Sequence, residues 1–386
     1  MTLFLFTFFL IYASIHLYAY LKIKAAFAFG ITTSIFLISF MVIMVFAPIV
    51  IRLSEKQGLE FFARLMSYAG YTWMGLLFLF TSASIIIDIY HFLIYLSGLI
   101  LRKDLIAFIP SSRISFFIPL ILSILIAIYG SFEAKNIRTE RIMIRSHKIP
   151  ESIGRLRIVQ ISDVHLGLIV RKERLEKILK EVKGVEPDLL VSTGDLVDGQ
   201  INGLPGLAEL LRDINPRYGK FAITGNHEFY AGLKQAMDFT EKAGFTILRG
   251  EGLTIAGLFN IAGVDDPAGK NYGLFREVEE KKLLSGLPTE KFTLFLKHRP
   301  FLERNAIGLF DLQLSGHTHK GQIFPLGLIT RLAYPADSGY LALQNNSHLY
   351  VSRGSGTWGP PIRFLSPPEV TVIEILPINV SGTGEN

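Results

Sequence analysis

The sequence predicts an N-terminal bundle of membrane-spanning helices followed by an α/β domain. Of the 386 residues, 50% are hydrophobic, the mean hydropathy is +0.39, and the apolar excess lies before about residue 132. Beyond it, short apolar runs alternate with amphipathic stretches and glycine turns, the pattern of a layered α/β domain. We therefore divide the chain into a transmembrane domain (1–132), a linker with a first strand (133–154) and a second domain (155–386).

Four apolar segments predict the membrane bundle, over about residues 2–21, 25–51, 71–101 and 114–129. A span needs roughly 20 apolar residues, so the second and third have length to spare, whereas the fourth is marginal and is either a span or an interfacial segment. Residues 57–67 form an amphipathic stretch that predicts a short interfacial helix. We expect a multi-pass integral protein of the plasma or inner membrane, with the lipid bilayer as its partner; its oligomeric state stays open.

Two ionisable residues, Asp88 and His91, lie three positions apart inside the third apolar segment. Ionisable groups at membrane depth indicate a functional site by default. The alternative is that they pair with each other or lie near the membrane interface. We favour this alternative.

Composition excludes two classes of site. The net charge is +6 and the isoelectric point about 9.2, but no basic run carries interleaved aromatic residues, so we predict no nucleic-acid partner. Basic residues that flank the membrane segments explain the charge instead. The chain has no cysteine, so disulfides and thiolate metal ligands are excluded. Nitrogen and oxygen ligands remain, and they suit Mn, Fe or Zn, of which we favour Mn.

Five short motifs rich in metal-ligand residues follow one another in the second domain. They are Asp163-Val164-His165, Gly194-Asp195 with Asp198, Gly225-Asn226-His227-Glu228, Lys297-His298-Arg299-Pro300 and Gly316-His317-Thr318-His319. Each comes just after an expected strand, over residues 156–161, 189–193, 218–224, 292–297 and 312–315, and helices are expected over 174–183 and 233–243. In open α/β sheets, sites are built at the carboxyl ends of the strands.

These residue types suit the hydrolysis of a phosphate ester by two metal ions. Two ions about 3.5–4 Å apart activate a water and neutralise the phosphoryl oxygens. Asp163 and His165 can bind one ion from a single turn, and Asp195 can reach inward as a bridging carboxylate. Asn226 offers a carbonyl oxygen, and nitrogens come from His298, His317 and His319. His227 is left for proton transfer.

On these motifs the chain resembles the calcineurin-like metallophosphoesterase superfamily, and within it the membrane-anchored branch, over about residues 155–375. The resemblance implies a four-layer α/β/β/α sandwich and His227 as the catalytic histidine. It implies that one metal is held by Asp163, His165, Asp195 and His319, and the other by Asp195, Asn226, His298 and His317. Lys320 stands where this branch usually has glycine. Whether Lys320 adds a cation beside the substrate or is only solvated stays open.

Four further acidic residues accompany the motifs. We expect Asp198 and Glu228 to support the ligands rather than bind metal. Asp265 and Asp266 either line the cleft or make the chain reversal that an Asp-Asp-Pro turn favours.

We expect a membrane-bound two-metal hydrolase acting on a lipid-linked phosphodiester or pyrophosphate, such as a nucleotide-diphospho-lipid. The alternatives are an anchored enzyme with a soluble phosphoester substrate, and a non-enzymatic receptor, which a missing ligand would indicate. Positively charged residues favour a cytoplasmic catalytic domain. Eight lie on its side (Arg52, Lys56, Arg64, Lys135, Arg138, Arg141, Arg145, Lys148) and five on the other (Lys22, Lys24, Arg102, Lys103, Arg113).

Overall fold

The computed structural model describes residues 2–199 and 206–378, which form two compact units. The first unit comprises the chain up to Phe132 together with the short segment Gly359–Phe364. The second unit comprises Glu133–Trp358 and the chain from Leu365 onward. The chain therefore leaves the second unit for the first after Trp358 and returns at Leu365, a feature that the sequence did not indicate.

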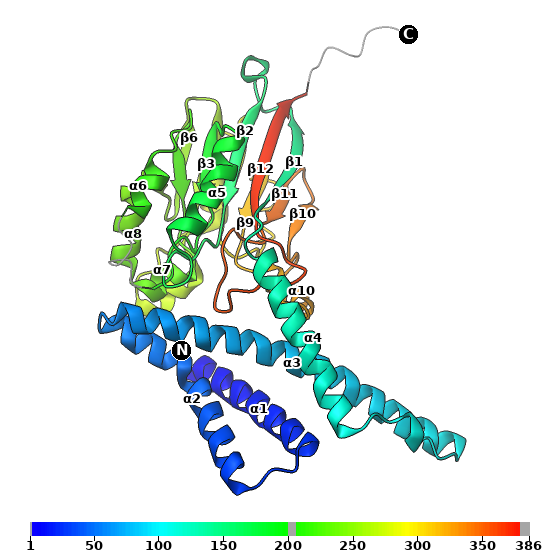
Figure 1. Cartoon of the computed structure of the whole chain (residues 1–386). Coiled ribbons are helices and arrows are strands. Elements are labelled where there is room, and N and C mark those ends of the chain that lie inside the picture. Colours follow the sequence, from blue (N-terminus) through cyan, green and yellow to red (C-terminus); the bar gives the residue numbers. More distant parts are fainter. Residues whose placement is uncertain (1, 200–205, 379–386) are drawn as a thin grey trace. The chain divides into compact units, whose positions relative to one another are not determined.

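Four long apolar helices make up most of the first unit: α1 (Thr2–Ala26), α2 (Ile31–Lys56), α3 (Glu60–Leu101) and α4 (Ser112–Glu133), with a 3₁₀ turn η1 (Ile106–Phe108) before α4 (Figure 1). Each is long and apolar enough to cross a membrane. The fourth segment, expected to be marginal, extends over 22 residues. The prediction of a separate interfacial helix over 57–67 is wrong, because the residues from Glu60 onward belong to the 42-residue α3. At 1.5 Å per residue α3 is about 63 Å long, roughly twice the hydrocarbon thickness of a bilayer.

Asp88 in α3 forms its ion pair with a helix other than its own. Its carboxylate pairs with the ammonium of Lys22 and accepts a hydrogen bond of 2.6 Å from the hydroxyl of Tyr18, both in α1. His91 lies 3.4 Å from the hydroxyl of Ser115 in α4. Asp88 and His91 were expected to pair with each other or to lie near the interface; the pairing is wrong, because the ion-pair partner of Asp88 is Lys22.

The segment Gly359–Phe364, which we call the strap, packs against α3 and α4 within the first unit. The amide of Arg363 donates to the carbonyl of Gly130 at 3.0 Å, and Arg363 is fully buried. A side chain at Gly130 would collide with Ile362 and with the carbonyl oxygen of Arg363. A side chain at Gly75 in α3 would lie 3.1 Å from Ile362. Glycines at these two positions therefore let the helices approach the strap closely.

Two six-stranded sheets form the second unit. The first has the order β1-β12-β2-β3-β4-β5 and the second β10-β11-β9-β8-β7-β6. The strands of the first are β1 (Arg138–Ser146), β12 (Glu369–Pro377), β2 (Leu156–Ile161), β3 (Leu189–Ser192), β4 (Lys220–Ala222) and β5 (Thr246–Ile247). Those of the second are β10 (Gly339–Ala342), β11 (His348–Val351), β9 (Leu312–Ser315), β8 (Phe292–Leu296), β7 (Phe259–Gly263) and β6 (Glu251–Ile255). The last strand, β12, joins the first sheet between β1 and β2.

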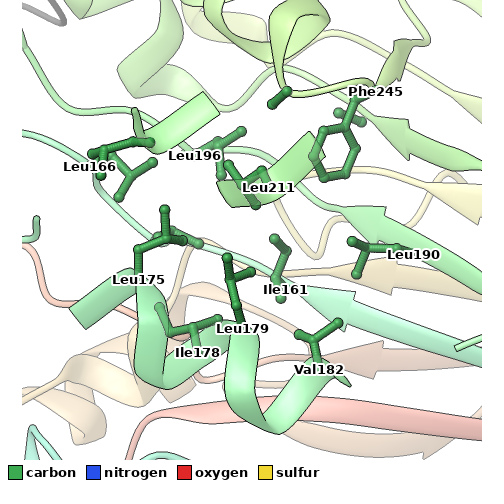
Figure 2. Close-up of a cluster of buried hydrophobic side chains, with 14 of the residues drawn as sticks. Ile161, Leu166, Leu175, Ile178, Leu179, Val182, Leu190, Leu196, Leu211 and Phe245 are labelled. Atoms are coloured by element: carbon green, nitrogen blue, oxygen red, sulfur yellow. The ribbon is translucent and has the colours of Figure 1, made fainter. Parts of the chain in front are cut away.

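Helices and 3₁₀ turns connect the strands of the two sheets. They are α5 (Lys172–Gly184), α6 (Leu207–Arg212), α7 (Asn226–Ala231), α8 (Leu233–Lys242), α9 (Glu280–Ser285) and α10 (Leu326–Ala333), with the 3₁₀ turns η2 (Glu151–Ile153), η3 (Pro267–Tyr272) and η4 (His319–Gly321). Leu175 and Leu179 of α5 pack with Leu211 of α6 against Ile161 and Leu190 of the first sheet (Figure 2). This order of layers is the expected α/β/β/α sandwich.

A continuous apolar core lies between the two sheets. Ile158 and Leu189 from the first sheet meet Phe259, Leu294 and Leu312 from the second, and none of the five has measurable solvent exposure. Burying one such side chain contributes about 1.5–3 kcal/mol. Strands β2, β3 and β4 are mutually parallel, as are β7, β8 and β9. This core therefore holds the carboxyl ends of the strands, where the motifs begin, in fixed positions.

Candidate metal centre and active site

The predicted site residues follow directly after buried strands. Asp163 comes two residues after β2, Asp195 three after β3, and His298 and His317 two after β8 and β9. Asn226, after β4, begins α7. The structure thus places ligands from both sheets at the carboxyl ends of parallel strands.

One cluster is formed by Asp163, His165 and His319, whose ligand atoms all lie within 4.8 Å of one another. Nε2 of His319 is 3.1 Å from Nε2 of His165 and 3.4 Å from Oδ1 of Asp163. Two ligands about 2.1 Å from one ion are about 3.0–3.4 Å apart, so these separations fit a shared metal. All three residues are buried.

A second cluster contains Asp195, His298 and His317. Nε2 of His298 lies 3.3 Å from Oδ2 of Asp195 and 3.2 Å from Nδ1 of His317. Nδ1 of His298 donates to the carbonyl of Thr193 at 2.8 Å. That bond leaves Nε2 as the ring nitrogen available to a metal, the usual arrangement for a ligating histidine.

Asp195 belongs to more than one group of candidate ligands. It also lies within 4.8 Å of His165 and His227, with Oδ2 3.8 Å from Nε2 of His165. The amide oxygen of Asn226 is buried and has no hydrogen-bond partner within the described residues. A buried polar atom without a partner is costly unless it binds something. The donor set therefore fits two divalent ions, for which Asp195 could be a shared ligand.

The backbone around the clusters is strained in a way that brings the side chains together. Asp163, His165, Asp195, His317 and His319 all have φ between 47° and 71°, a region that residues other than glycine rarely adopt. Such conformations cost about 1–3 kcal/mol each and gather at functional sites.

Motif glycines allow these loops to come into contact. A Cβ at Gly225 would collide with the carboxylate of Asp195, and one at Gly316 would collide with Ser162 and the carboxylate of Asp163. Gly225 has φ −100°, and neither glycine needs a left-handed backbone. They are therefore required for close approach rather than for their own backbone conformation.

His227 adjoins both the clusters and a second carboxylate. Its Nδ1 lies 2.8 Å from Oδ1 of Asp198, and its backbone amide donates to Oδ1 of Asp195 at 2.8 Å. Burial alone would lower the pKa of His227, but the charges of Asp195 and Asp198 outweigh it and raise the pKa to about 9. Asp198 thus orients an imidazole, the supporting role that the sequence favoured for it.

The other histidines are held in contrasting environments. Burial and the neighbouring charge of His227 lower the pKa of His165 to about 3, and burial with His298 lowers that of His317 to about 3. For His298, Asp195 outweighs burial and raises the pKa to about 10. A neutral imidazole is the form that binds metal, and the lowered pKa of His165 and of His317 favours that form.

Glu228 links two motif loops through hydrogen bonds to their backbone amides. This is the supporting role expected for it, rather than that of a metal ligand. Its carboxylate accepts hydrogen bonds from the amides of Gly225 at 2.7 Å, Asp195 at 3.0 Å and Leu196 at 2.8 Å. Burial, followed by the charge of Asp195, raises its pKa to about 7.

Asp265 and Asp266 hold arginines outside the clusters. Asp265 pairs with Arg249 at 2.7 Å and accepts from Thr224 at 2.9 Å, whereas Asp266 pairs with Arg299 at 2.7 Å. The two carboxylates therefore act as structural partners of the loops.

Two further residues near the site, Gln322 and Trp358, were not predicted from the sequence. The side chain of Gln322, just after the last motif, accepts from the amide of Trp358 at 2.9 Å and donates to its carbonyl at 2.8 Å. The ring of Trp358 lies 6.1 Å from that of His227. These residues are separated by 36 positions or more, which is why spacing along the chain did not connect them.

Comparison with known proteins agrees with this site. Residues 156–321 match the family model described as calcineurin-like phosphoesterase. A protein of Aquifex aeolicus named as an uncharacterized metallophosphoesterase is 42% identical over 255 residues, which are 66% of this chain and 97% of that protein. An uncharacterized metallophosphoesterase of Campylobacter jejuni is 34% identical over 68% of this chain and 70% of its own.

A relative from a vertebrate combines the same two parts by name. The transmembrane protein with metallophosphoesterase domain of Danio rerio is 33% identical over 268 residues, 66% of this chain and 61% of that protein. The motifs, the sandwich and the identity over nearly the full length of the Aquifex protein lead to one conclusion. The chain belongs to the calcineurin-like metallophosphoesterase family.

Proposed function

We propose that this metallophosphoesterase hydrolyses a phosphodiester or pyrophosphate in a lipid-linked substrate, such as a nucleotide-diphospho-lipid. The observation that carries the proposal is the chain of neighbouring His/Asp groups at the site, in which Asp195 belongs with His298 and His317 and also with His165, on a chain that has four helices able to span a membrane. An amphiphilic substrate is concentrated in the same bilayer as a membrane-spanning enzyme, whereas the bilayer does not raise the local concentration of a soluble substrate.

The two ligand sets are the ones that the family resemblance implies, and the clusters support them. One ion would be held by Asp163, His165, Asp195 and His319, and the other by Asp195, Asn226, His298 and His317. Bound ions of this kind supply an activated water and neutralise charge on the phosphoryl oxygens. All the proposed donors are nitrogen or oxygen atoms. We propose Mn²⁺ as the resident metal, because carboxylate and carbonyl oxygens suit Mn²⁺ and the chain has no cysteine thiolate, a ligand that would favour Zn²⁺.

His227 would carry the proton that the departing oxygen needs. Asp198 holds its Nδ1, so that Nε2 is the atom left to donate. Burial of the ring beside the clusters keeps bulk water from competing for that proton. General acid catalysis of this type contributes roughly 10²–10⁴ in rate.

The lipid dependence can be tested with two substrates that share one head group. We expect the full chain in lipid nanodiscs with Mn²⁺ to hydrolyse a nucleotide-diphospho-lipid with a kcat/KM at least about tenfold above that of the same nucleotide-diphospho-sugar without acyl chains. Phosphate or nucleotide release after chelation of the metal serves as the blank. Equal kcat/KM values for the two substrates would show that the helices only anchor a soluble-substrate enzyme.

We also propose that the second unit faces the cytoplasm. The eight basic residues on its side lie in the last turns of α2, in the first turns of α3 and within 15 residues of the end of α4, where the positive-inside rule applies. A fluorescent reporter fused after Asn386 is expected to fluoresce, and an alkaline phosphatase fusion there to stay inactive. An active phosphatase fusion without fluorescence would place the domain outside and remove the access to cytoplasmic nucleotide-linked substrates.

A further inference from the structure

Three half-exposed aromatic residues form a group beside His227. The ring centroid of Tyr230 lies 5.2 Å from that of His227, and Trp358 lies 6.1 Å from it on a different element. Tyr272 extends the group, 6.3 Å from Tyr230. Their exposed fractions are 44% for Tyr230, 40% for Tyr272 and 50% for Trp358. Large aromatic surfaces left in water beside a reactive group indicate a binding surface rather than a core.

Separate anchors fix the three rings. Tyr230 follows His227 by three positions on α7, so the two side chains lie on one face of that helix. Tyr272 ends η3, whose first turn is capped by Asp266, which accepts from the amide of Ala268 at 2.8 Å. The surface is therefore organised before any ligand arrives.

Hydrogen bonds hold the backbone of Trp358 within the second unit. Its amide donates to the side-chain oxygen of Gln322 at 2.9 Å, and its carbonyl accepts from the side-chain nitrogen of Gln322 at 2.8 Å. An exposed tryptophan held by its backbone in this way loses little entropy when its ring contacts a ligand.

We propose that Tyr230, Tyr272 and Trp358 form a subsite for a planar aromatic ring on the leaving group of the substrate, a nucleobase or another aryl group. The proposal rests on the proposed function, because His227, which two of the rings contact, is there the donor to the leaving oxygen. Flat aromatic faces stack on planar rings, and this stacking is tolerant of which base is present. The subsite thus selects the class of leaving group rather than one base.

Two pairs of ligands that differ only by a ring test the subsite by direct binding. Titration calorimetry on the Mn²⁺-loaded full chain compares a nucleoside 5′-monophosphate with ribose 5-phosphate, and phenyl phosphate with methyl phosphate. We expect the ring-bearing member to bind about tenfold tighter or better, the range of one stacked base. Discrimination within both pairs or the nucleoside pair identifies a nucleobase, and discrimination within the phenyl pair alone identifies another aryl group.

Variants at Trp358 separate stacking from a general loss of the site. Trp358→Ala should reduce the preference to about twofold or less while binding of ribose 5-phosphate stays unchanged, and Trp358→Phe should keep most of it. No preference in the wild type, or an equal loss for both members of a pair in Trp358→Ala, overturns the subsite. Because binding is measured without turnover, an inactive wild type that still prefers the ring would contradict the proposed function and leave the subsite standing.

Discussion

Asp195→Ala is expected to abolish phosphoester hydrolysis and to remove metal from both clusters at once. Asp195 lies within ligand distance of both groups of histidines, and its Oδ2 is 3.3 Å from His298. Losing a shared carboxylate removes an anion from two coordination shells, whereas losing any other ligand affects one. We expect turnover to fall by roughly 10⁴–10⁶, the cost of disabling a catalytic unit in hydrolases.

The controls for this variant separate metal loss from misfolding. Asp195→Asn keeps an oxygen near the amide of His227 but lacks the charge, so it should remain folded and still lose metal. Asp238→Ala removes a carboxylate that pairs only with exposed Lys234 on α8, and such surface pairs contribute little. Near wild-type turnover by Asp195→Ala at saturating Mn²⁺ would contradict a shared carboxylate.

His227→Ala is expected to slow turnover by roughly 10²–10⁴ while both metals stay bound. The proposed coordination shells are complete without His227, and its Nδ1 is already engaged by Asp198 at 2.8 Å. Elemental analysis of the purified variant, alongside steady-state turnover, measures the two effects separately.

The structure also allows a second role for His227, that of a metal ligand. It lies within ligand distance of His165 and Asp195, so metal lost in step with activity would make it a ligand. Asp198→Asn is the matched test of the orienting bond. It should lower turnover less than His227→Ala and also leave the metal content unchanged.

The sequence predicted much of the α/β sandwich because its central strands are buried on both faces. The expected strands 156–161 and 312–315 coincide with β2 and β9, whose residues are almost all buried. Buried apolar runs bounded by polar turn residues leave little choice of structure. The same turns carried the motifs, so all eight candidate site residues could be named before the fold was known.

Features that depend on contacts between distant parts of the chain could not be predicted from the sequence. The placement of β12 between β1 and β2 depends on pairing across more than 200 residues, and its apolar pattern would suit either sheet. The strap shows no helical or strand periodicity in the sequence. Its contact glycines, Gly75 and Gly130, lie in apolar helices, and nothing in the sequence of those helices indicates that a distant segment packs against them. Tyr230 of α7 and Trp358 both lie near His227, and Tyr272 of η3 lies near Tyr230, only because the tertiary fold brings these three elements together.

Metal content together with electron paramagnetic resonance of the Mn²⁺-loaded full chain tests directly whether two metal ions share Asp195. We expect two Mn²⁺ ions per chain whose signals are coupled, because ions that share a ligand lie about 3.5–4 Å apart. We also expect chelation to remove the coupled signal and the turnover together. A single uncoupled ion per chain in a fully active preparation would contradict a shared two-metal site.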